Sequence, residues 1–217
     1  MKKILVVKIF LLSALFADNT LVKIAPDTPS VTINDHGVEV TIKRIQDTAH
    51  RLTDDFAKTS RECPPHCIRP IEPIKGVQTV GEIELIDFIK NKVYKKKGLL
   101  IDSRIKSLYE IETIPGAINI PFTLLETNSQ KIIDRLFKLL GVKKKSNGEY
   151  DFSQAKELVV FCNGPWCGQS VVFIEDMIKY GYPKEKLFYY RGGMQAWKLL
   201  GLTTVVHKAI EAKESKK

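Results

Sequence analysis

The chain has 217 residues, of which 44% are hydrophobic and 27% are charged, and its formal net charge is +9 at pH 7. This length predicts a globular protein with one substantial core plus an appendage, or two small domains. The lysine runs at 95–97 and 143–145 lie between periodic segments without interleaved aromatic side chains, so they predict solvated loops and argue against a nucleic-acid partner.

Residues 1–17 have the organisation of a cleaved signal peptide. Lys2 and Lys3 give a positive start, residues 4–16 are mainly apolar, and Ala17 supplies a small residue at the expected cleavage point. A membrane anchor fits less well, because a helix of that length spans about 20 Å of a hydrocarbon core that is about 30 Å thick. We therefore expect a periplasmic or otherwise exported protein, with no stable membrane insertion after cleavage.

Residues 18–76 are expected to form an N-terminal arm outside the core. The stretch 31–45 alternates in hydrophobicity around the turn residues 35–37, which predicts a short hairpin. Residues 46–62 are expected to be weakly helical or irregular. The prolines within 62–73 prevent regular structure and predict a rigid linker.

The linker contains the pair Cys63 and Cys67, separated by Pro64-Pro65-His66. In an oxidising compartment this pair predicts a local disulfide, either structural or redox-active. Thiolates with an imidazole also suit copper, and the spacing resembles the copper site of periplasmic chaperones that serve respiratory oxidases. The expected function requires neither a metal nor an organic cofactor.

From residue 77 to 206, predicted strands alternate with predicted helices, which is typical of an α/β fold with a mainly parallel sheet covered on both faces. The expected strands are Val77–Val80, Leu99–Asp102, Leu158–Phe161 and Leu187–Tyr190, and the expected helices are Glu82–Lys92, Ser129–Leu140, Ser170–Tyr180 and Gly193–Leu200. The strand Leu158–Phe161 is continuously apolar and is expected to be central. Residues 207–217 form a charged tail.

Cys162 follows this central strand directly, in a glycine-containing turn that leads into a helix. Open α/β sheets bind ligands at this position. Backbone amides of the turn and the positive end of the helix favour an anion, so the Cys162 thiol is expected to ionise more readily than a free cysteine. The same donors would stabilise a persulfide or a bound oxyanion.

Four motifs in order resemble the rhodanese family of sulfurtransferases. They are LLIDSR at 99–104, IPGAINIP at 114–121, VVFC at 159–162 with the following QSVVFIEDMIKYGY, and YRGGMQAW at 190–197. The resemblance implies a rhodanese-like fold in which Cys162 accepts sulfur as a persulfide and passes it to a thiol or other nucleophile. The implied partners are a small sulfur donor and a thiol acceptor, which a protein thiol can supply.

The loop departs from the family pattern in length and charge. Ser170 lies eight residues after Cys162, which is further than usual, and Gln169 stands where an arginine is usual. Arg104 or Arg191 could compensate for the missing cation, and Thr113 replaces a usual histidine. The substrate-binding set implied by the resemblance is Arg104, Asn163, Gly164, Trp166, Gly168, Gln169, Ser170 and Arg191.

Several side chains keep more than one interpretation. Cys167 is either a thiol that resolves the Cys162 persulfide, a packed free thiol, or half of a structural disulfide. Trp166 is either an aromatic wall beside the sulfur or a packing residue. Asp102 and Arg104 are either a structural pair that braces the loop or directly catalytic. The isolated residues His36, His50 and His207 are expected to have no chemical role.

Two alternatives to sulfur transfer remain open at this point. In one, the same fold uses Cys162/Cys167 and Cys63/Cys67 for thiol–disulfide exchange. In the other, the chain is a non-catalytic binding module, which predicts that Cys162 is buried or permanently bonded in a disulfide.

Overall fold

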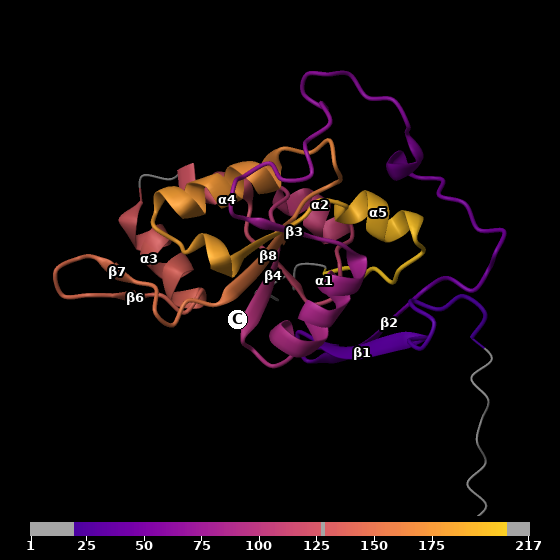
Figure 1. The fold of residues 1–217 in the computed structure, drawn as a ribbon, viewed down its shortest axis with the longest axis horizontal. Coiled ribbons are helices and arrows are strands. Elements are labelled where there is room, and N and C mark those ends of the chain that lie inside the picture. Colours follow the sequence, from indigo (N-terminus) through magenta and orange to yellow (C-terminus); the bar gives the residue numbers. More distant parts are fainter. Residues whose placement is uncertain (1–19, 127–128, 208–217) are drawn as a thin grey trace, which may run out of the picture.

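A computed structural model describes residues 20–126 and 129–207 and contains a five-stranded sheet in the order β3-β9-β8-β4-β5, with all neighbours parallel. The strands are β3 (Gln78–Val80), β4 (Gly98–Asp102), β5 (Ala117–Asn119), β8 (Glu157–Phe161) and β9 (Leu187–Tyr190). Figure 1 shows this sheet between two layers of helices. The α/β fold and the central place of the strand before Cys162 are thereby confirmed.

The burial of β8 explains why it is central. Leu158 and Val160 belong to one apolar cluster, whereas Val159 and Phe161 belong to a second cluster. Successive side chains of a strand point to opposite faces, so β8 supplies both halves of the core. Its continuous apolar run therefore reflects burial on two faces.

The helices lie within one or two residues of the expected ranges. They are α1 (Glu82–Phe88), which continues as a π-helical turn at Ile89–Val93, α3 (Gln130–Leu139), α4 (Gln169–Lys179) and α5 (Gly193–Leu199). Side chains of α3 and α4 enter the first cluster, and those of α1 and α5 enter the second. The short helix α2 (Lys106–Ile111) and strand β5 were not predicted from the pattern.

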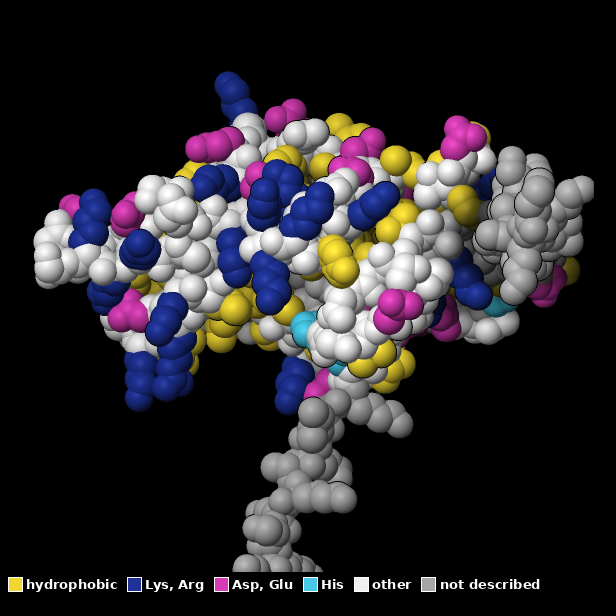
Figure 2. Space-filling model, turned by 90° about the horizontal axis from the view of Figure 1, so that it is seen from below, with side chains coloured by type: hydrophobic (Ala, Val, Ile, Leu, Met, Phe, Trp, Pro, Cys, Tyr) yellow, Lys and Arg dark blue, Asp and Glu magenta, His cyan; other side chains and the backbone are white. Residues whose placement is uncertain are grey.

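The lysine run at 143–145 is not a plain loop. Lys143–Lys144 form strand β6, which pairs antiparallel with β7 (Tyr150–Asp151). Both lysines are exposed, as expected. Figure 2 shows lysine and arginine side chains spread over one face of the molecule, with acidic side chains between them.

The N-terminal hairpin consists of β1 (Ser30–Asp35) and β2 (Val38–Lys43), which pair antiparallel. Contrary to the expectation of an arm outside the core, its inward side chains Val31, Ile33 and Ile42 are buried in the second apolar cluster. Alternation had placed these apolar residues on one face, and the domain surface beside α1 covers that face. The hairpin therefore belongs to the folded core.

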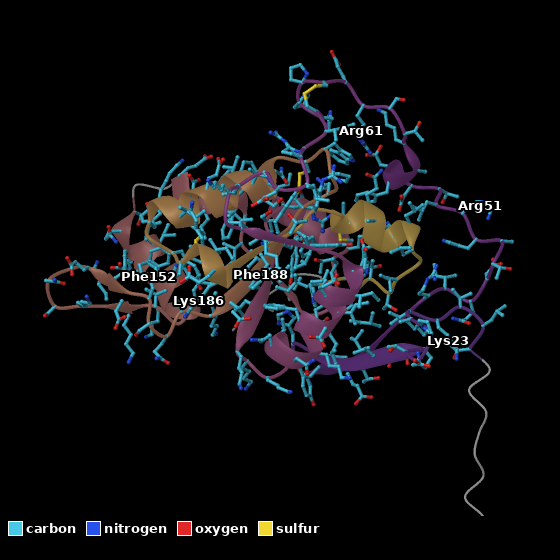
Figure 3. All side chains as sticks on the ribbon, in the orientation of Figure 1. Lys23, Arg51, Arg61, Phe152, Lys186 and Phe188 are labelled. Atoms are coloured by element: carbon cyan, nitrogen blue, oxygen red, sulfur yellow. A yellow bond between two sulfur atoms is a disulfide. The ribbon has the colours of Figure 1, made fainter. Side chains whose placement is uncertain are left out.

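Residues 44–76 remain outside the core and contain no helix longer than the 3₁₀ turn η1 (Asp55–Ala57). From here on, the arm means residues 44–76 alone, without the hairpin that was expected to belong to it. Lys198 of α5 contacts Asp54 of the arm and Glu112 of the domain. The arm passes over the sheet edge where β8 ends, and the part that carries Arg61 rises above it (Figure 3).

Within the described residues, no helix is long and apolar enough to cross a membrane. The predicted signal peptide and residues 208–217 of the predicted tail lie outside the described residues.

Candidate active site

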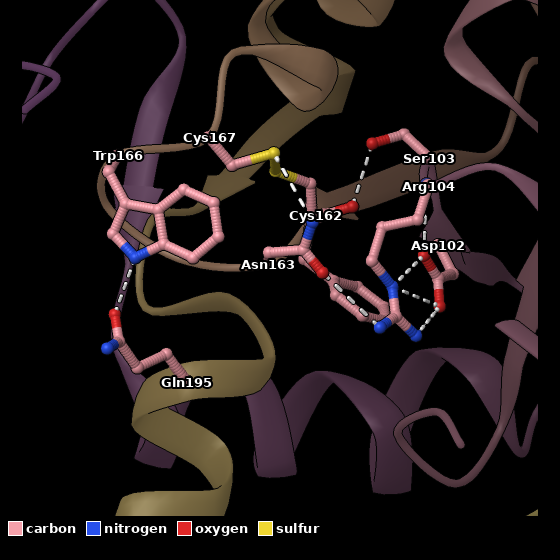
Figure 4. Close-up of a disulfide and its surroundings, with 9 residues drawn as sticks. Asp102, Ser103, Arg104, Cys162, Asn163, Trp166, Cys167 and Gln195 are labelled. Atoms are coloured by element: carbon pink, nitrogen blue, oxygen red, sulfur yellow. Dashed lines mark hydrogen bonds and ion pairs between the residues drawn. A yellow bond between two sulfur atoms is a disulfide. The ribbon is translucent and has the colours of Figure 1, made fainter. Parts of the chain in front are cut away.

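Cys162 lies directly after β8, and residues 163–168 connect it to the start of α4. Cys162 and Cys167 form a disulfide that closes this segment into a ring, which we call the loop (Figure 4). Cys162 is 2% exposed and Cys167 is 6% exposed. In this state neither sulfur is a free thiol, so nucleophilic chemistry at Cys162 requires reduction of the loop disulfide.

The first turn of α5 holds the loop from one side. Met194 N donates to Cys162 O at 3.0 Å, and Gln195 N donates to Asn163 O at 2.8 Å. Gly193 has a φ of +55°, and a side chain there would collide with the backbone of residues 162–164. Glycine at 193 therefore permits this close approach, which explains part of the RGGMQAW motif.

Two residues after β4 hold the loop from the other side. Ser103 Oγ and N both donate to Phe161 O, at 2.8 and 3.0 Å. Arg104 Nη1 reaches Asn163 Oδ1 at 3.5 Å. The end of β4 thus positions the residue before Cys162 and the residue after it.

Arg104 is itself fixed by a buried carboxylate. Its Nη2 lies 2.6 Å from Asp102 Oδ2, and its Nε lies 2.9 Å from Asp102 Oδ1. Thr113 Oγ1 donates to the same Oδ2 at 2.8 Å, and Arg104 Nη2 also donates to Glu112 O. Thr113, at the place of the family's usual histidine, therefore completes the pair, and the geometry favours a bracing role for Arg104.

Arg191 is also engaged elsewhere. Its Nε and Nη2 donate to Arg69 O of the arm, at 3.2 and 2.8 Å. Arg69 N donates in turn to Pro165 O of the loop at 2.8 Å. Arg191 therefore clamps the arm to the loop, and this contact occupies the guanidinium that had been expected to compensate for Gln169.

The arm supplies a different cation. The guanidinium of Arg69 lies against Gly168, where any side chain would collide with it. Arg69 Nε is buried without a hydrogen-bond partner, as are Gln169 Oε1 and Ser170 Oγ at the first turn of α4. Gly168 has no side chain to cap this turn, so its backbone amides are open donors. The Arg69 guanidinium and these amides form an electropositive wall beside the loop, whereas Gln169 Oε1 is an acceptor and adds nothing to it.

Trp166 separates two pockets beside the loop. Trp166 Nε1 donates to Gln195 Oε1 at 2.8 Å, as Figure 4 shows, and the Arg61 guanidinium lies 4.3 Å from the ring centroid. One pocket has a volume of about 400 Å³ and includes Asn163, Trp166, Arg104 and Glu112 in its walls. The other, of about 520 Å³, lies between the arm and Arg191. Organic sulfur compounds fit such volumes.

The second cysteine pair, Cys63 and Cys67, lies in the part of the arm that contacts Trp166 of the loop. Cys63 and Cys67 form a disulfide in the arm, and His66 between them packs edge-on against Trp166 at 5.2 Å between ring centroids. A disulfide offers no thiolate to copper, so this state favours the disulfide interpretation of the pair.

Sequence reasoning did not identify Arg61, His66, Arg69 or Gln195 as residues of this region. Arg61, His66 and Arg69 lie in an irregular segment whose path over the loop has no periodic signal. Gln195 lies inside the YRGGMQAW motif, and its place in this motif was the one sequence feature that could have predicted its contact with the loop.

Several solved structures resemble part of this chain. A rhodanese-related protein from Thermoplasma volcanium is 19% identical, with 60% of this chain and 99% of that chain covered and a TM-score of 0.40. A human single-domain sulfurtransferase is 23% identical, with 56% and 96% covered and a TM-score of 0.40. A thiosulfate sulfurtransferase from Pseudomonas aeruginosa is 17% identical, with 63% and 21% covered and a TM-score of 0.45, so this chain matches about a fifth of it.

No curated protein matches the chain. The family model of the Rhodanese-like domain matches residues 84–200, which span α1 to α5 and include the loop. This chain belongs to the rhodanese-like domain family.

Proposed function

We propose that the protein is a sulfurtransferase in which Cys162 carries sulfane sulfur as a persulfide once the loop disulfide is reduced. The observation that carries this proposal is the position of Cys162, at the end of the central strand and beside the open amides of α4. Membership of a family that contains sulfurtransferases supports it. The electropositive wall supplies the stabilisation that a thiolate or persulfide anion needs.

The reaction begins when a dithiol reductant gives two electrons to the loop disulfide and becomes a disulfide itself. The Cys162 thiolate then attacks the outer sulfur of a donor such as thiosulfate, which leaves as sulfite, and Cys162 becomes a persulfide. An acceptor thiolate attacks the outer sulfur of this persulfide, takes it, and regenerates the Cys162 thiolate. We assign the pocket between Arg104 and Trp166 to the donor or the acceptor.

Cys167 offers a second outcome for the persulfide. Its thiolate can attack the inner sulfur, which is Cys162 Sγ, so that the loop disulfide re-forms and hydrosulfide leaves. The persulfide sulfur is then lost as hydrosulfide and does not reach an acceptor, and the protein returns to the disulfide state. It needs another dithiol reductant before the next turnover.

Sulfur loading of two cysteine variants tests the proposal. After reduction, Cys162→Ser is expected to take no sulfur from thiosulfate or polysulfide, because an alcohol has no accessible anion near pH 7. Cys167→Ser is expected to load and to keep its persulfide for longer than the parent. Loading of Cys162→Ser at the parental level would contradict the assignment, and an unchanged lifetime in Cys167→Ser would remove the resolving role.

Thiol–disulfide exchange is the second candidate, and the disulfide between Cys162 and Cys167 favours it. Exchange predicts that the reduced protein passes electrons to a protein disulfide without gaining sulfur.

A buried disulfide is also expected of a non-catalytic binding module. In that case the loop disulfide would resist dithiol reductants in the folded protein.

We also propose that residues 1–17 direct export to the periplasm. Two disulfides among four cysteines suit an oxidising compartment, which supports this location. Fractionation of the producing cells, with N-terminal sequencing of the mature chain, tests it. A mature protein that keeps Met1 and stays with cytoplasmic markers would contradict it.

A further inference from the structure

A histidine pair and a buried carboxylate meet at the turn of the N-terminal hairpin. Asp35 ends β1, His36 follows it in the turn before β2, and His207 comes from the segment after α5. Their ligand atoms lie within 4.8 Å of one another. The sequence had given no reason to pair His36 with His207, because they lie far apart along the chain.

The turn places the Asp35 carboxylate inside and leaves the His36 imidazole at the surface. His36 and Gly37 both have positive φ, +51° and +94°, which is the conformation of a tight hairpin turn. Asp35 is 4% exposed, and its Oδ1 accepts a hydrogen bond from Gly116 N at 2.9 Å. The carboxylate is therefore fixed, and its Oδ2 faces His207.

One of the separations matches an edge of a tetrahedral metal site. His207 Nε2 lies 3.4 Å from Asp35 Oδ2, whereas His36 Nε2 lies 3.7 Å from the other oxygen of that carboxylate, Oδ1. Ligands about 2.0–2.1 Å from a zinc ion stand about 3.3 Å apart in a tetrahedron. The two imidazole rings lie edge to face, with planes 83° apart and centroids at 4.9 Å, so the histidines are in direct contact beside the carboxylate.

The ligand atom of His207 has no hydrogen-bond partner among the described residues. His207 Nε2 is buried, and its one close polar neighbour there is Asp35 Oδ2, at ion-pair distance. Tyr109 stacks on the His207 ring, with centroids at 5.3 Å and planes 18° apart, and its hydroxyl donates to Ala117 O. The stacked Tyr109 ring thus restricts the orientation of the His207 ring.

From this geometry we propose a zinc site formed by Asp35 Oδ2, His36 Nε2 and His207 Nε2, with water as the fourth ligand. Two neutral imidazoles and one carboxylate form a donor set that zinc accepts. His36 Nε2 now lies 3.1 Å from Ala117 O, and on binding it exchanges that contact for the ion and carries its ring proton on Nδ1. The ion ties the N-terminal hairpin to the end of the domain.

The test is a titration of the untagged mature protein with Zn²⁺ alone, without reductant, so that the four cysteines remain in disulfides. We expect one ion per chain and a rise in the thermal unfolding midpoint with zinc. His207→Phe keeps an aromatic ring on Tyr109 but removes the ligand nitrogen. His36→Asn removes an exposed imidazole and tolerates positive φ. Both are expected to weaken zinc binding at least about tenfold.

Co²⁺ provides a second readout, because a four-coordinate site with nitrogen and oxygen ligands gives visible absorption bands. His50→Gln, which removes an exposed histidine outside the cluster, is the matched control and is expected to bind zinc like the parent. If His207→Phe does not fold, His36→Asn alone decides. Absence of stoichiometric zinc binding, or binding that survives His36→Asn unchanged, would overturn the proposal and leave the cluster as an ion pair of Asp35 with His207.

Discussion

The two disulfides have nearly the same spacing in the sequence but very different surroundings. Cys162–Cys167 is buried and is held by hydrogen bonds from α5 and the end of β4. Cys63–Cys67 belongs to an irregular segment, and Cys63 is exposed. The difference teaches that similar spacing does not give similar surroundings: the loop pair is held between elements of the domain beside the Arg69 guanidinium, whereas the arm pair lies in a segment without regular structure.

The largest expected effect comes from removing Arg104, which pairs with the buried Asp102 and contacts Asn163 of the loop. Arg104→Ala leaves the fully buried Asp102 carboxylate without its partner. Loss of one member of a buried ion pair costs about 3 to 5 kcal/mol, so the free energy of unfolding should fall by that amount. Sulfur loading should fall with it, because Asn163 loses its contact with Arg104.

Lys106→Ala is the control for this variant. Lys106 pairs with Glu110 at 3.4 Å on the surface of α2, and its side chain is 71% exposed. Such a pair contributes about 0.5 kcal/mol or less. Chemical denaturation of both variants measures the contrast. Equal losses of stability in the two variants would show that the buried pair of Asp102 and Arg104 does not brace the loop.

A second variant removes the cation that the arm lends to the loop. Arg69→Ala keeps the backbone contacts with Pro165 and Arg191 but deletes the guanidinium beside Gly168. A charge-assisted contact is worth about 1.5 to 3 kcal/mol, so the apparent affinity for thiosulfate should fall about ten- to hundredfold. Arg51→Ala, which removes an arm arginine bonded to its neighbours' carbonyls, is the control. Unchanged affinity in Arg69→Ala would end the role of Arg69.

A smaller effect is expected on the order in which a reductant opens the two disulfides. The final extent of their reduction should not differ. In the folded protein a dithiol reductant should open Cys63–Cys67 before Cys162–Cys167, because Cys162 and Cys167 are only 2% and 6% exposed. Timed alkylation with peptide mapping measures this order. Simultaneous opening would show that the loop moves freely, and it would remove the contrast between the two pairs.

The sequence predicted the loop and its strand well, because a continuously apolar strand followed by cysteine and glycine is a strong local pattern. It missed β5 and α2, which are too short for periodicity to be visible. It also missed the docking of the hairpin and the arm. These contacts depend on distant pairs such as Arg69 with Pro165, and no local pattern encodes such a pair.

The smallest expected effect is a loosening of the arm in acid. Burial raises the pKa of Asp54, but the hydrogen bond with Lys198, the hydrogen bond from Phe56 N and the charge of Lys198 together outweigh it and leave the pKa below its ordinary value. A lowered pKa means that the contact stabilises the arm above the ordinary carboxyl pKa and is lost as pH falls through the lowered value. Hydrogen exchange in the segment 52–62 should therefore rise in the parent below about pH 4.

Asp54→Asn is the reference for this experiment, because an amide keeps the cap on Phe56 N but does not titrate. Exchange in this variant should lack the acid-dependent step. A step of the same size in both proteins would assign it to another group.

The most direct test of the central claim is the intact mass of the mature protein in its two redox states after exposure to thiosulfate or polysulfide. We predict that the protein with reduced cysteines gains one sulfur, mapped to Cys162, and that the protein with both disulfides intact gains none. Sulfur on the fully oxidised protein, or a reduced protein that gains no sulfur on Cys162, would contradict the account.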